Sequence, residues 1–141
     1  MLENYTPYSV AYNLKKMIDD DKRVDKKYAR RALSKWLSLH PTNVTQKVDF
    51  ILQHFIENVA HLLNGEAKAM VVTGGRSAAV KYKLAFDKAI KENRNMQGIR
   101  ALVAFSGKVK GKELGDEEGF SIDPEADYSE INLNPDMGSL D

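Results

Sequence analysis

The residues best suited to bind a ligand form the short segment Thr73-Gly74-Gly75-Arg76-Ser77. It follows an apolar run, Ala69–Val72, and precedes a stretch with helical spacing, so we expect a turn between a strand and a helix. Free N–H groups and the dipole at a helix N-terminus favour an anion, and glycines let it approach the backbone closely. Thr73 and Ser77 add hydroxyls, and Arg76 adds a forked pair of donors that fits a phosphate. The alternative is an ordinary turn whose glycines serve only backbone geometry.

A second turn of similar character follows about 30 residues later. Ala101–Phe105 is another short apolar run, and helical spacing fills residues 77–92 between the two runs. This order predicts a parallel βαβ unit with a right-handed crossover. Because ligands bind beyond the carboxyl ends of parallel strands, Ser106, Gly107 and Lys108 should lie at the same edge as the first turn. Phosphate contacts there would give affinity without base readout; the alternative is a solvated lysine loop.

Helices are expected before these runs. A proline-broken segment that is extended at Thr6 precedes a short helix capped by Ser9 and ending near Ile18. Asp25 is a good N-cap for a helix to about His40, in which Arg30, Arg31 and Lys35 lie on faces other than the apolar one. Pro41 ends that helix. The strongest periodicity is in the next one, which Thr42 or Asn43 should cap and which should reach about Asn64.

The pattern predicts an α/β fold with three regions. Residues 1–40 read as a helical connector and residues 41–107 as a domain fragment with the βαβ unit. Residues 108–141 read as an acidic, glycine-rich, partly disordered loop with at most one short strand near 128–133. Two parallel strands cannot close a doubly wound sheet, which usually has five or six. The sequence is therefore typical of a piece of a larger domain whose sheet has a bare edge.

The charges are unevenly distributed. Residues 1–112 hold all 21 basic residues and ten of the 20 acidic ones, a formal net charge of +11, and the remaining acids all follow Lys112. A basic body with an acidic tail indicates either a polyanion-binding surface or a solvated lysine-rich face beside a disordered tail.

The absence of cysteine excludes disulfides and thiolate metal sites. His54, Glu57 and His61 share one helix face, but their spacing favours an ordinary surface, and we expect no metal site.

Several segments, in order, resemble the motor (R) subunit of type I restriction enzymes, a superfamily 2 helicase-like DNA translocase. Lys68–Thr73 with Arg76 and the following Ala79-Val80 and Tyr82-Lys83 is similar to helicase motif IV of that family, and Ala101–Gly107 to the strand and turn after it. Further similar segments are Leu2–Tyr8, Leu39–Pro41 with Gln46-Lys47 and His54-Phe55, and Asp127–Glu130 with Asn132 or Asn134. The resemblance covers nearly the whole chain.

The sequence departs from the family at informative places. Gly74-Gly75 stands where the family more often has serines, and no phosphate-loop motif is present, since Gly111-Lys112 is followed by Glu113. The acidic run Asp116–Glu118 is no magnesium motif, because glycine precedes it. The resemblance therefore implies a fragment: the interdomain connector and the first half of the second RecA-like (P-loop NTPase-type) domain.

The resemblance implies the following function. The parent protein would be a cytoplasmic, ATP- and magnesium-dependent translocase and endonuclease. It would act on double-stranded DNA with the rest of the motor subunit and with the methyltransferase and specificity subunits, away from any membrane. This segment would contact the DNA backbone through the two turns, with no catalytic residue, no cofactor and no ATPase or nuclease activity of its own. The alternative is a stand-alone nucleic-acid-binding α/β scaffold domain; a small enzyme is weakly supported, because no acid–base or nucleophile–base pair stands out.

Overall fold

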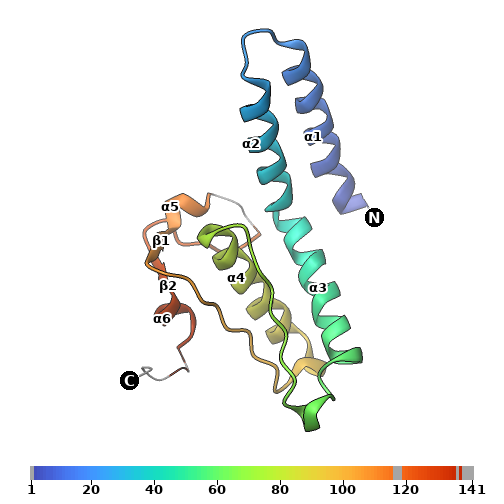
Figure 1. Ribbon diagram of the computed structural model, residues 1–141, viewed down its shortest axis with the longest axis vertical. Coiled ribbons are helices and arrows are strands. Elements are labelled where there is room, and N and C mark those ends of the chain that lie inside the picture. The colour runs from blue at the N-terminus through green and yellow to red at the C-terminus, as the bar shows by residue number, and fades with distance from the viewer. Residues whose placement is uncertain (1, 116–118, 136, 138–141) are drawn as a thin grey trace.

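The computed structural model describes residues 2–115, 119–135 and 137, with side chains from Tyr8 onward. It is mostly helical, at 60%, with one small sheet. An antiparallel pair of helices, α1 and α2, projects from a body in which α3 and α4 pack together (Figure 1). The elements are α1 (Leu2–Asp20), α2 (Lys26–Ser38), α3 (Pro41–Asn58), the 3-10 turn η1 (Leu63–Gly65), α4 (Arg76–Glu92), the 3-10 turn η2 (Arg94–Met96), β1 (Lys108–Lys110), α5 (Gly111–Leu114), β2 (Asp127–Ser129) and α6 (Glu130–Leu133).

The α1–α2 hairpin replaces the extended connector that we expected near Thr6. Helix α1 runs through Pro7 to Asp20, although Pro7 has no N–H to donate to the hydrogen-bond ladder of the helix. The expected cap of α2 is confirmed: the Asp25 carboxylate accepts from the N–H groups of Lys27 and Tyr28, at 3.0 and 3.1 Å. No helix among the described residues has the length and apolar character that crossing a membrane requires.

Helix α3 begins and ends earlier than the sequence predicts. Its N-cap is His40, whose Nδ1 accepts from Thr42 N–H at 3.4 Å, with Pro41 in the first turn, where a missing N–H costs nothing. The side-chain amide of Asn43 does not cap α3. It donates to the carbonyl oxygen of Leu37 at 2.6 Å, which joins α3 to the end of α2. The helix ends at Asn58 rather than near Asn64.

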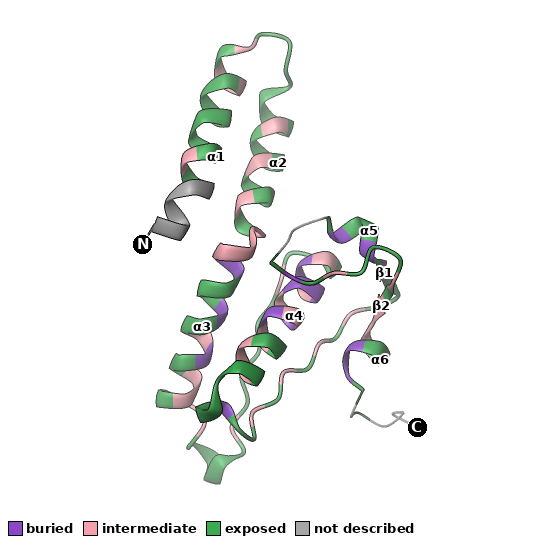
Figure 2. Ribbon diagram, turned by 180° about the vertical axis from the view of Figure 1, so that it is seen from behind, coloured by how far each residue is buried: buried purple, intermediate pink, exposed green. Residues whose placement is uncertain are grey.

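The main core lies between α3 and α4. Val44 and Val48 are fully buried on α3, and they pack in one cluster with Ala85 of α4, Met96 of η2 and Phe120. Figure 2 shows the buried stretches of α3 and α4 on the sides where the two helices meet. A second cluster joins Val80 of α4 to Val109, Leu114 and Leu133, so the C-terminal segment packs against the other side of α4.

The predicted parallel sheet is absent from residues 69–73 and 101–105. Both segments run in the same direction, opposite to α4, as a βαβ unit requires, but they are drawn-out coils without strand pairing (Figure 1). Val103 pairs with a side chain instead: the Asn134 amide accepts from its N–H at 3.1 Å and donates to its carbonyl at 2.8 Å. Met70 and Val72 remain 87% and 84% exposed, because no neighbouring strand covers them. An α/β class is loosely consistent with this structure.

The sheet that forms is antiparallel and lies in the region expected to be a loop. β1 pairs with β2 in the register Lys108↔Ser129, Val109↔Tyr128 and Lys110↔Asp127. The short helices α5 and α6 follow the two strands directly. Residues 108–134 are thus more regular than the sequence predicts, although the acidic run Asp116–Glu118 lies outside the described residues.

Candidate functional site

The structure brings the two predicted turns together. Arg76 is the first residue of α4, and its guanidinium Nη1 donates to the carbonyl oxygen of Ser106 at 3.4 Å. Gly107 lies against the same group, because a side-chain Cβ built there would be 3.2 Å from Arg76 Nη1. Gly107 also has a φ of +81°, a left-handed conformation that favours glycine. Thirty residues of sequence separate the two turns, so the course of the chain around α4 creates this juxtaposition.

The N-terminus of α4 is open. Its N-cap, Gly75, has extended backbone and makes no side-chain cap, and no acidic residue lies in the first turn. The N–H groups of that turn have no partner within the helix, as at any helix start. A Cβ at Gly74 or Gly75 would meet nothing within 4 Å, so no described part of the chain crowds the turn at these two glycines. An anion at this position would face backbone donors, the helix dipole and the Arg76 side chain.

The two hydroxyl residues of the turn differ in what they can do. The Thr73 hydroxyl donates to the Gly75 carbonyl at 3.2 Å, so it braces the turn itself. Ser77 is half-buried and lines a pocket of about 250 Å³ between α4 and the end of α2. That pocket is also lined by Ala32, Lys35, Trp36, Leu39, Lys81 and Glu113. The open face of the site therefore consists mainly of Gly74, Gly75, Arg76 and Gly107.

The lysines after the second turn face carboxylates. Lys108 Nζ lies 3.8 Å from Asp127 Oδ2, and Lys112 Nζ lies 2.8 Å from Glu125 Oε1. Both lysines remain about two-thirds exposed, so these ion pairs stabilise the hairpin only slightly. Sequence reasoning missed this pairing. The signal was the alternation of opposite charges, with lysines at positions 108, 110 and 112 and acidic residues at positions 123, 125 and 127.

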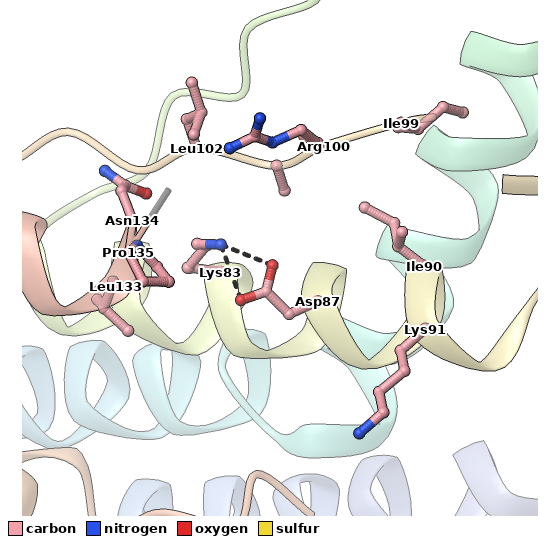
Figure 3. Close-up of a pocket in the computed structure, with 11 residues that line it drawn as sticks. Lys83, Asp87, Ile90, Lys91, Ile99, Arg100, Leu102, Leu133, Asn134 and Pro135 are labelled. Carbon is pink, nitrogen blue, oxygen red and sulfur yellow. Dashed lines mark hydrogen bonds and ion pairs between the residues drawn. The ribbon is translucent and has the colours of Figure 1, made fainter. Parts of the chain in front are cut away.

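A second hollow, of about 300 Å³, lies on the other side of α4 under residues 99–102. Figure 3 shows Lys83 and Asp87 on α4, below the segment that carries Arg100 and Leu102. The buried ammonium of Lys83 donates to both carboxylate oxygens of Asp87, at 2.6 and 2.8 Å. This pairing at i and i+4 neutralises the charge of a lysine that would otherwise be buried alone. We interpret the pair as structural.

Among the described residues, no group of three or more His, Asp or Glu side chains converges in a way that could hold a metal ion. Comparison of the chain with models of protein families, with curated proteins and with solved structures found no match.

Proposed function

We propose that this chain binds the sugar–phosphate backbone of duplex DNA at the open N-terminus of α4, as part of a translocating motor. The observation that carries the proposal is the meeting of the Arg76 turn with the Ser106–Gly107 turn at a helix N-terminus that has no side-chain cap. Phosphate is one of the anions that a guanidinium and helix N–H groups bind. The basic body, with a net charge of +11 over residues 1–112, would attract a polyanion to it.

We further propose that the motor is the R subunit of a type I restriction enzyme, on the strength of the sequence resemblance. The chain would then supply the connector and half of a RecA-like domain. ATP and magnesium would bind elsewhere in the parent protein, and DNA cleavage and sequence recognition would belong to other domains and subunits.

Exposed apolar side chains support a place in a larger assembly. Met70 and Val72 are almost fully exposed, and Leu102 is 56% exposed, all on coils that follow the predicted strand paths. Neighbouring apolar side chains left in water commonly mark a surface that another protein segment covers. The remaining strands of a RecA-like sheet would cover these coils.

A stand-alone nucleic-acid-binding scaffold is the second candidate. The observation in its favour is that the chain builds cores of its own, one between α3 and α4 and one between α4 and the C-terminal segment. Both candidates use the same DNA-contacting turns. They differ in whether the exposed coils at 69–73 and 101–105 acquire strand partners.

Replacing Arg76 with glutamine tests the site. We expect R76Q to weaken binding of a 30-base-pair duplex about tenfold at low salt, because one charge-assisted contact is lost. The slope of log affinity against log salt concentration should fall by about 1. Fluorescence anisotropy of a labelled duplex measures both quantities.

Arg94 offers a matched control, since it is an exposed arginine in η2 at the opposite end of α4. R94Q carries the same charge change and should bind the duplex nearly as the unaltered chain does. Equal weakening by R76Q and R94Q would show that net charge, and not the turn, governs binding.

A further inference from the structure

Helix α2 carries a row of cations along one face. Lys27, Arg31 and Lys35 are spaced at i, i+4 and i+8, so they lie one above another over about 12 Å of helix. All three are exposed. Helix α2 contains five basic residues and no acidic one. We call Lys27, Arg31 and Lys35 the α2 cationic stripe.

Two acidic residues near the hairpin tip, Asp19 and Asp25, bond to groups other than the stripe side chains. The Asp19 carboxylate accepts from Arg30 at 2.6 Å, and the Asp19 backbone carbonyl accepts from Lys26 at 2.8 Å. The hydrogen bond from Arg30 is the main cause that holds the pKa of Asp19 below its ordinary value. Asp25 caps α2 through its side chain. Within the described part of the chain, no carboxylate lies at ion-pair distance from Lys27, Arg31 or Lys35.

The stripe leads to the candidate site. Its last member, Lys35, lines the same pocket as Ser77 in the first turn of α4. Lys81, one turn further along α4, lies in that pocket as well, with its ammonium 5.5 Å from the centre of the Phe120 ring. From the pocket, α2 extends away from the α3–α4 body toward the hairpin tip (Figure 2). The stripe therefore begins at Lys35, beside the pocket that Ser77 lines, and follows α2 toward the hairpin tip.

We propose that the α2 cationic stripe is a second contact surface for the phosphate backbone, continuous with the α4 turn, so that one duplex lies along both. This inference rests on the proposed function and extends its footprint from the turn to the hairpin. Duplex DNA carries about one negative charge per 1.7 Å of its axis, so a stripe of about 12 Å runs beside several phosphates. Three cations in one row, none of them at ion-pair distance from a carboxylate among the described residues, match that charge pattern.

The test replaces all three stripe residues with glutamine in the full chain: K27Q, R31Q and K35Q together. Glutamine keeps a high helix propensity, and these side chains make no bond that the fold needs, so the melting temperature should be unchanged. We expect the slope of log duplex affinity against log salt concentration to fall by about 3, one for each lost phosphate contact. Affinity should fall equally for duplexes of unrelated sequence.

A matched triple variant separates the stripe from net charge. Lys47, Lys88 and Lys91 are exposed lysines of α3 and α4 outside the stripe, and K47Q/K88Q/K91Q removes the same charge. This control should keep the salt slope of the unaltered chain. Equal losses in both triples, or no loss in the stripe triple, would overturn the proposal.

Two further comparisons complete the test. One distinguishes the phosphates of DNA from those of an anionic membrane, and the other separates this inference from the proposed function. Cationic helices with exposed aromatic residues, such as Tyr28 at 74% exposure, also bind anionic membranes. Cosedimentation with phosphatidylserine vesicles that depends on the stripe, combined with unchanged duplex affinity, would overturn the DNA assignment. If R76Q loses affinity and the stripe triple does not, the proposed function stands and this inference fails. The reverse result would keep the stripe as a DNA contact but overturn both the proposed function and the continuity of the stripe with the α4 turn.

Discussion

Replacing Gly111 with alanine is expected to lower the free energy of unfolding by about 3 kcal/mol or more. Gly111 is buried where α5 begins, and a Cβ there would overlap the carbonyl oxygen of Asp123 and lie 2.8 Å from Pro124 Cα. These neighbours are backbone atoms, which cannot swing aside as a flexible side chain can. Urea denaturation followed by circular dichroism measures the loss.

The surrounding hydrogen bonds explain why the crowding at Gly111 cannot be relieved without a loss of stability. Gly111 N–H donates to the Ala126 carbonyl at 2.9 Å, and Lys112 N–H donates to the Pro124 carbonyl at 3.1 Å. Moving the two segments apart to admit a methyl group would break both bonds and open the β1–β2 hairpin. Gly74 is the control, because a Cβ there meets open space and its φ lies outside the left-handed region. G74A should change stability by less than about 0.5 kcal/mol; similar losses in both variants would contradict this packing.

Replacing Asn134 with aspartate should destabilise the fold by about 2–4 kcal/mol at pH 7. The buried amide donates to Val103 O at 2.8 Å and accepts from Val103 N–H at 3.1 Å, in place of a neighbouring strand. An aspartate keeps the acceptor but loses the donor, and it sets a negative oxygen against a carbonyl oxygen. Thermal and urea denaturation of N134D at several pH values measure the effect.

The pH dependence of N134D has a definite sign. Burial and the opposed carbonyl favour the neutral acid, so the carboxyl pKa would be higher in the folded than in the unfolded chain. The destabilisation should therefore be largest above the folded pKa and diminish as pH falls toward the unfolded value of about 3.9. A neutral carboxyl can donate to Val103 O again. Asn95 is an exposed control, and equal losses in N95D and N134D would exclude the pairing with Val103.

Local sequence signals predicted those parts of the fold that local interactions decide. Asp25 caps α2 because its carboxylate reaches N–H groups two and three residues away. The apolar stripe of α3 buries Val44 and Val48 as its periodicity indicates. The joining of the Arg76 and Ser106 turns also followed from the order of apolar run, helix and apolar run.

Longer-range features could not be predicted in this way. Ala69–Val72 looks like a central strand, but burial on both faces requires neighbours that the run itself does not specify, and Met70 and Val72 are exposed. The β1 and β2 strands have three residues each, too few for a period to show. Asn134 pairs with a residue 31 positions away, and no local pattern reports such a contact.

The α2 cationic stripe was partly visible in the sequence. Arg31 and Lys35 fall on faces of the helix other than the apolar one, as their spacing predicts. The sequence does not show that Lys35 and Ser77 line one pocket. That arrangement depends on the angle at which α2 passes the start of α4.

The central claim is that the turn at the N-terminus of α4 receives DNA phosphate. A titration of the ¹⁵N-labelled chain with a short DNA duplex at low salt, followed by NMR, tests it most directly. We predict that the amide resonances of Gly74, Gly75, Arg76, Ser77 and Gly107 shift further than those of Lys91–Asn95 at the other end of α4. Duplex binding that moves the second set as much as the first, or leaves the first unmoved, would contradict it.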